Sequence, residues 1–301
     1  MKKLISLSIT ILTLSCSNDN HSKKVNNDPV QNSAKVTSNS TIDVLNQNVA
    51  YVGFIETFDF SNENEVYIGL YLLQDEISED EYLKIEKLAD SLIYEDDENS
   101  RYKFPENVSR KYFDLRGLSK LSIYDNQNRF VSHAEFLRVE FFNQSISSSF
   151  IAVYKADKKI KSGAMYGISN FTEAQKPINY AIREDTILTQ KVLTKLKVAM
   201  PYYGLANNGK HIQYKNSDST ISVVNSDEFA YIVLSHSKEF KILYKSPDLE
   251  NITDVLVVPQ MNHKLPYLLT RNVKPETDVM WDKLLYYDGT KYIDTKRQRI
   301  E

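Results

Sequence analysis

The chain has 301 residues, of which 42% are hydrophobic, and its formal net charge is −3. This hydrophobic fraction is enough for a packed core and excludes a wholly disordered chain. The mildly acidic balance argues against a nucleic-acid binder, which would present a basic face. The single cysteine excludes a disulfide scaffold, which needs pairs.

The chain starts with a basic segment and a short apolar run. Met1-Lys2-Lys3 precedes the apolar residues Leu4–Leu14, which are too few to span a bilayer, because a transmembrane helix needs about 20 residues. Ser15, a small residue, stands directly before Cys16, the only cysteine. This order of features predicts a signal peptide over residues 1–15.

The segment Thr13-Leu14-Ser15-Cys16 resembles the lipobox of bacterial lipoproteins, with Thr13 in place of the usual Leu, Val or Ile. The resemblance implies that a dedicated peptidase cleaves before Cys16, and that its thiol and its new amine carry acyl chains such as palmitate. Several such chains, at about 0.8 kcal/mol per buried CH₂, would hold the protein at a membrane. Ser17-Asn18-Asp19 weakly resembles the surface-export signals of Bacteroidota lipoproteins. We therefore expect a location in the cell envelope, at the outer membrane, with the periplasmic and the surface side both open.

The segment that follows the leader is polar, and the body after it is rich in aromatic residues. Residues 16–47 consist mostly of Asn, Ser, Lys and Thr and predict a flexible tether. The body contains all of the 20 Tyr and 13 Phe, which favour strands. We expect two β-rich subdomains, 48–170 and 185–301, which could also form one continuous domain. The predicted fold class is β-rich α+β, made mostly of antiparallel hairpins and a meander.

The first elements of the body are a hairpin and a helix. The apolar runs 51–58 and 66–73 flank a polar loop and predict the hairpin. Residues 78–94 predict the one clear amphipathic helix. It begins with the capping box from Ser78 to Glu81, and its apolar residues recur at helical spacing.

Strand-like runs follow from residue 121. Two hairpins are predicted, one from 121–124 and 129–133 and one from 150–154 and 160–166, with a further strand at 136–142. Residues 186–198 fit either a helix or a strand. The last hundred residues predict an antiparallel meander, because the runs are too closely spaced for parallel crossovers. Its strands are expected at 212–214, 221–223, 230–234, 240–244, 254–258, 266–270, 279–287 and 292–293, and Asp288-Gly289 is its strongest turn signal.

The catalytic motifs with a recognisable spacing are absent. The chain has no Gly-rich phosphate loop, no His-Glu-x-x-His and no Gly-x-Ser-x-Gly segment. The assignment of Cys16 to the anchor excludes thiol catalysis and thiolate zinc sites. The five histidines are scattered singly, at His21, His133, His211, His236 and His263. Two of them directly follow a serine, but neighbours on a strand face opposite ways, so this adjacency does not predict a nucleophile pair.

Carboxylates and aromatic residues offer weaker candidates. Asp59, Ser61 and Glu63 begin like a calcium loop, which fails because Asn64 and Leu70 replace its Gly and its last Glu. The acidic run 95–98 could bind Ca²⁺ but is more typical of a solvated helix end. An aromatic platform for sugars or protein partners could form from several residues, although core packing is the favoured interpretation. They are Trp281, Tyr286, Tyr287, Tyr292 and the pair Tyr202-Tyr203.

Lipidation of Cys16 is therefore the one site predicted from the sequence. No catalytic residue, cofactor or metal ligand is assigned. We expect a membrane-anchored envelope lipoprotein that does not catalyse a reaction and that binds a protein, a glycan or another envelope component, and not nucleic acid. The alternative is a lipid-anchored hydrolase whose acid-base residues are dispersed among the strands.

Overall fold

The computed structural model describes residues 50–57, 64–70, 78, 80, 83–85, 87–88, 100–143, 148–161, 163–169, 180–199, 209–214, 218–237, 239–247, 250–258, 265–275, 280–295 and 299–300. All of them belong to one compact unit, Asn39–Glu301. The other unit, Met1–Ser38, lies outside the described residues, and Cys16 with it.

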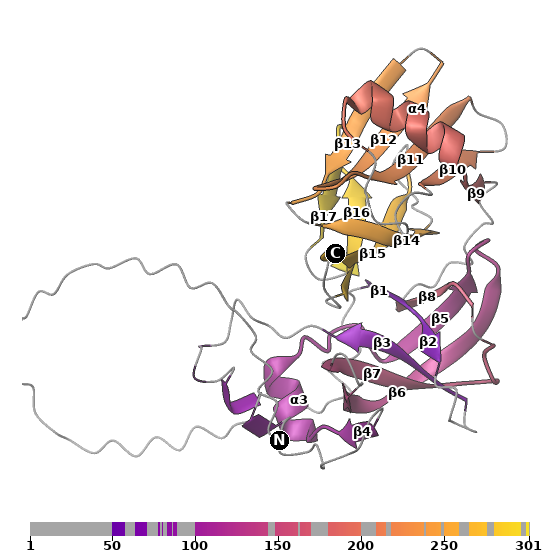
Figure 1. Ribbon diagram of the computed structural model, residues 1–301. Helices are drawn as coiled ribbons and strands as arrows, with labels where there is room; N and C mark the ends of the chain where they lie inside the picture. The colour runs from indigo at the N-terminus through magenta and orange to yellow at the C-terminus, as the bar shows by residue number, and fades with distance from the viewer. Residues whose placement is uncertain are drawn as a thin grey trace, which may run out of the picture. The chain divides into compact units, whose positions relative to one another are not determined.

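Antiparallel strands dominate the described residues (Figure 1). The strands of the first half are β1 Ala50–Phe54, β2 Glu56–Thr57, β3 Glu65–Leu70, β4 Ser100–Lys103, β5 Lys120–Asp125, β6 Phe130–Asn143, β7 Ser148–Ala156 and β8 Met165–Ser169. Those of the second half are β9 Tyr180–Glu184, β10 Lys210–Tyr214, β11 Ser219–Asn225, β12 Ala230–His236, β13 Glu239–Lys245, β14 Asn251–Val258, β15 Tyr267–Val273, β16 Met280–Tyr287, β17 Tyr292–Asp294 and β18 Arg299–Ile300. The helices with assigned bounds are α3 Glu106–Tyr112 and α4 Thr186–Leu196. The predicted β-rich α+β class is confirmed.

The first sheet closes on itself through the strand segment 50–57. Its strand order is β18-β1-β8-β5-β6-β7-β3-β2, and β4 also pairs with β6. β2 is the last strand of this order, and β1, which directly precedes β2 in the chain, lies at the other end beside the two-residue strand β18. β1 pairs with β8, at Val52↔Ile168, while β2 pairs with β3, at Glu56↔Tyr67. One continuous segment therefore joins both ends of the sheet.

The interior of the closed sheet is filled by side chains. A small closed sheet leaves no open channel, because inward side chains from all strands meet. The fully buried inward residues include Val66, Ile68, Leu121, Ile123, Ala152 and Tyr154. The helical residues Ile85 and Leu88 pack against the same core, as the apolar stripe of the helix predicted at 78–94 requires, while residues 89–94 lie outside the described residues.

Two hairpin predictions of the first half contain errors: the hairpin from 51–58 and 66–73 is confirmed only at its loop end, and the hairpin from 150–154 and 160–166 is wrong. Of residues 51–58, Glu56–Thr57 pair with β3, whereas Ala50–Phe54 pair with β18 and β8. The run 160–166 does not pair back on 150–154; its last residues begin β8, which pairs with β1 and β5. Closure explains both errors, because it requires pairing between strands that are distant in the chain. The runs 129–133 and 136–142 also merge into one strand, β6, with a β-bulge between Phe136 and Arg138.

The second half forms two further antiparallel sheets, and the predicted meander is confirmed. The orders are β13-β12-β11-β10-β9 and β14-β15-β16-β17. The ambiguous residues 186–198 form helix α4, which lies across one face of the five-stranded sheet (Figure 1). Asp185 caps its first turn by accepting a hydrogen bond from the backbone N–H of Leu188 at 2.9 Å. Lys197 ends it in the left-handed conformation.

The run from Val255 to Val258 shows how these sheets are layered. Val255 and Val257 pack against the five-stranded sheet, while Leu256 and Val258 pack against β1, β5 and β8 of the closed sheet. Alternate residues of a strand face opposite sides, so this apolar run belongs to a sheet buried on both faces. The four-stranded sheet thus lies between the other two.

Candidate binding groove

Several residues singled out in the sequence lie outside the described part of the chain. They are Cys16, His21, Asp59, Ser61, Glu63, the run 95–98, Tyr202-Tyr203 and His263. Lipidation of Cys16 stays a prediction.

The three described histidines pair with serines on neighbouring strands, not with the serines beside them in sequence. His133 lies opposite Ser122, with 3.3 Å between its Nδ1 and the Ser122 Oγ. His236 lies opposite Ser219, with 2.8 Å between its Nδ1 and the Ser219 Oγ. Both histidines are exposed. Neither has a carboxylate among the hydrogen-bond partners found for it, so neither forms a Ser-His-carboxylate arrangement.

His211 is the one described histidine that is fully buried. Its Nε2 lies 3.2 Å from the carbonyl oxygen of Asp185, which can only accept, so Nε2 carries the proton. Its Nδ1 then accepts from the Ser222 hydroxyl at 2.9 Å. Burial lowers the pKa of His211 and keeps the ring neutral, against the opposing effect of the Asp185 carbonyl. A substrate has no path to this ring, and its role is to fix the start of α4 to the sheet.

The buried carboxylates of the closed sheet are held in ion pairs with arginines. Glu65 accepts from Arg101 at 2.9 Å and from Arg138 at 3.0 Å, and Arg138 also donates to Glu140 at 2.5 Å. Burial alone would raise the pKa of Glu65, but the hydrogen bonds from the two arginines outweigh it and hold the pKa below its usual value. The described residues contain no group of three or more metal-ligating side chains.

A second set of charges links strands of different sheets. Arg271 of β15 pairs with Asp282 at 3.0 Å and with Glu56 of β2, and its guanidinium lies 4.5 Å from the centre of the Phe54 ring. Burial raises the pKa of Asp282, although the adjacent Arg271 acts in the opposite direction. These contacts link the closed sheet to the four-stranded sheet.

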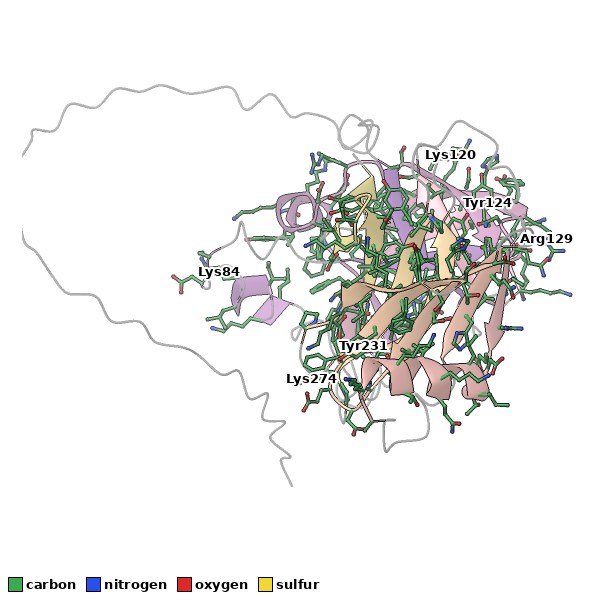
Figure 2. All side chains as sticks on the ribbon, turned by 90° about the horizontal axis from the view of Figure 1, so that it is seen from above. Lys84, Lys120, Tyr124, Arg129, Tyr231 and Lys274 are labelled. Atoms are coloured by element: carbon green, nitrogen blue, oxygen red, sulfur yellow. The ribbon has the colours of Figure 1, made fainter. Side chains whose placement is uncertain are left out.

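The aromatic residues of β16 and β17 do not form a platform. Tyr287 and Tyr292 are buried in the core between the two C-terminal sheets. Trp281 and Tyr286 are half-buried, and their odd spacing on β16 places them on opposite faces. At the turn between β5 and β6, Tyr124 and Arg129 lie close together (Figure 2). Arg129 also pairs with Asp125 at 2.7 Å.

A hollow lies between α4 and the β12–β13 pair. This groove has a volume of about 530 Å³ and is open to solvent. Its lining residues are Ile187, Leu188, Gln190, Lys191, Val192, Thr194 and Lys195 of α4, with Ser235 of β12 and Phe240 of β13.

The groove follows from the two faces of α4. Val192 and Leu193 are buried against the sheet, whereas Ile187, Lys191 and Lys195 recur every four residues along one side of the helix. That side faces the groove, and Ile187 is 67% exposed. The helix therefore presents an apolar and cationic wall.

The charged side chains that line this groove are all positive. Two lysines and no acidic residue line it. The Lys195 ammonium lies 5.2 Å from the centre of the Phe240 ring, so it is held over the apolar floor. A groove that combines apolar surface with lysines suits a ligand with both apolar and anionic groups.

Sequence reasoning missed this groove. The four-residue spacing of Ile187, Lys191 and Lys195 indicates one wall of a groove only if these residues lie on a helix. The sequence left residues 186–198 open between helix and strand. The position of Phe240 in the groove floor depends on the pairing of β13 with β12, which the sequence predicted as part of the meander.

Comparisons with known protein-family models, curated proteins and solved structures found no match to this chain. Among the described residues, no helix is long and apolar enough to cross a membrane.

Proposed function

We propose that this protein is a lipid-anchored envelope protein that does not catalyse a reaction and that binds an acidic polypeptide segment of an envelope partner in the groove between α4 and β13. The single observation that carries the binding proposal is the groove itself, which Lys191 and Ile187 help to line and in which Lys195 lies over the Phe240 ring. The lipobox-like segment that ends at Cys16 supports the anchor.

Chemistry favours a polypeptide over a sugar chain as the ligand. A neutral glycan would make no use of the two lysines. A highly charged glycan would gain little from Ile187, Leu188 and Phe240, which provide the apolar lining. An acidic peptide with interspersed aliphatic residues satisfies both features.

The binding proposal is tested with a labelled peptide probe. The probe is a synthetic nonapeptide in which glutamate alternates with valine, and binding to the folded protein is followed by fluorescence anisotropy. We expect saturable binding that weakens as salt is added, because exposed charges are screened. Lys195→Glu should weaken it by at least tenfold.

The matched control is Lys158→Glu, which reverses the charge of an exposed lysine in the turn after β7, outside the groove. This variant should bind the probe as the wild type does. Equal binding of a nonapeptide in which lysine replaces glutamate would contradict the proposal. So would hydrolysis of a glycan, ester or peptide that is abolished by one His or carboxylate substitution, because it favours the hydrolase alternative.

The anchor is tested separately in the native cell. Cys16→Ala should abolish labelling by a fatty-acid analogue and release the protein from the membrane fraction, whereas Ser17→Ala should change neither. Unchanged labelling of Cys16→Ala would refute lipidation at this position.

A further inference from the structure

Strand β13 forms one edge of the five-stranded sheet. One of its sides pairs with β12, from Tyr231↔Lys245 to His236↔Glu239. In the described part of the chain, no strand pairs with its other side. Edge strands of this kind present backbone N–H and C=O groups to which a further strand can add.

The groove opens at this same edge. Ser235 and Phe240 lie opposite each other in the β12–β13 ladder, and both line the groove. Ile242, two residues further along β13, lies on the same face as Phe240 and is 48% exposed. Apolar surface thus continues from the groove floor to the free side of β13.

The free side of β13 carries features that control what can pair with it. The strand is regular from Glu239 to Ile242, and the ladder shifts register after Ile242. Lys241 and Lys245 are exposed. Charged residues and a bulge on an edge strand oppose indiscriminate pairing, but lysines attract an acidic strand.

We infer that the acidic segment binds as an extended strand that adds to the free side of β13, with alternate side chains directed into the groove. This inference rests on the proposed function and specifies how the same site holds its ligand. Backbone hydrogen bonds to Glu239–Ile242 supply affinity, and the groove selects alternate side chains. In the alternating probe the side chains on the groove face are all glutamates: their carboxylates meet Lys191 and Lys195 of α4, and their methylene groups cover the apolar lining, while the valines lie on the other face.

A second copy of this chain fits the edge less well. Two copies joined antiparallel at β13 about a twofold axis keep the same face of the sheet in both copies. Both α4 helices would then border one seam, and Lys191 and Lys195 of each copy would face those of the other. Like charges at short range disfavour this arrangement.

The test uses two N-methylated forms of the nonapeptide probe. In a strand, the N–H groups of alternate residues point to the same edge. Methylating the valine nitrogens therefore blocks one edge of the peptide, and methylating the glutamate nitrogens blocks the other. With strand addition, one form should bind at least tenfold more weakly than the other, and bound unmethylated probe should slow hydrogen exchange at alternate amides of Glu239–Ile242.

The outcomes separate this inference from the proposed function. If the unmethylated probe binds and depends on Lys195, but both methylated forms bind equally and exchange on β13 is unchanged, strand addition is wrong and the groove remains a binding site. If the unmethylated probe does not bind, the proposed function fails and strand addition with it. A dimer of the protein alone in sedimentation velocity, dispersed by Ile242→Lys, would assign the edge to a second copy and overturn the inference.

Discussion

Gly53 of β1 and Gly167 of β8 lie where side chains meet inside the closed sheet. A methyl group on Gly167 would lie 2.9 Å from Ile55 Cδ1 and 3.1 Å from Leu121 Cδ1. A methyl group on Gly53 would clash with Cγ2 of Ile68, a fully buried side chain. Cγ2 is attached directly to Cβ, so it cannot swing away as the end of a long chain could.

We predict that Gly53→Ala lowers the free energy of unfolding by about 1–3 kcal/mol, the usual range for overpacking a core. Gly69→Ala is the matched control, because an added Cβ there meets no atom within 4 Å. The control should be neutral or slightly stabilising, since alanine costs less chain entropy than glycine. Urea unfolding measures both, and equal losses would contradict the packing explanation.

His211 gives the stability of the fold a defined pH dependence. Because burial lowers its pKa below the ordinary value of 6.5, the unfolded chain binds a proton more readily than the folded one. The stabilisation is complete above pH 6.5 and is lost as the pH falls towards the lowered pKa.

We therefore predict that the free energy of unfolding falls as the pH drops below 6.5, with a slope of up to about 1.4 kcal/mol per pH unit from this residue. His211→Gln should reduce that slope even if it lowers stability at every pH. Parallel curves for the wild type and His211→Gln would refute this role.

At the scale of elements, two non-glycine residues adopt nearly the same left-handed backbone for different reasons. Lys197 ends α4 at φ 60°, and Asn128 ends the β5–β6 turn at φ 59°. The Asn128 side chain accepts from the Tyr166 hydroxyl at 2.5 Å and donates to the Tyr180 hydroxyl at 2.8 Å. Lys197 is exposed.

Glycine substitutions should consequently have opposite effects at these two positions. Lys197→Gly is expected to raise the free energy of unfolding by about 1 kcal/mol, because glycine adopts this backbone without a Cβ penalty. Asn128→Gly gains the same relief from the Cβ penalty but leaves the buried Tyr166 hydroxyl without this partner, a loss of about 1–3 kcal/mol. Thermal unfolding of both variants measures the difference, and a gain in both would contradict the role of the Asn128 side chain.

The sequence predicted local elements well and distant pairings poorly. The meander of the last hundred residues is correct because its strands pair with their neighbours across short turns such as Asp288-Gly289. The partners of Met165–Ser169 could not be predicted, because β1 lies more than a hundred residues earlier and apolar alternation alone does not identify a partner. The seven-residue helix α3 was missed, since it is too short for a helical periodicity.

At the scale of the whole molecule, the apolar layer between the closed sheet and the four-stranded sheet joins the two halves of the chain. It contains Val52 and Ile168 from the first half and Leu256, Leu269 and Leu284 from the second. Because these side chains are buried against each other, the two halves predicted as subdomains share part of their core.

We predict that both halves unfold in one transition and that Leu269→Ala shifts this transition in both. Leu269 is fully buried, so truncation should cost about 2–5 kcal/mol. The fluorescence of Trp281, the only tryptophan, reports on the four-stranded sheet. In a second protein, Trp281→Phe combined with Phe130→Trp reports on the closed sheet. If Leu269→Ala shifts the unfolding transition reported by Trp281 but not the transition reported from position 130, the two halves are independent subdomains.

The closed sheet also sets the order in which this chain can fold. Its first strand pairs with residues 165–169 and, at Ala50↔Ile300, with almost the last residues of the chain. Such contacts span most of the sequence, and proteins dominated by distant pairings fold slowly, in about milliseconds to seconds. The segment 50–57, although synthesised before every other described strand, must wait for the end of the chain before all of its hydrogen bonds can form.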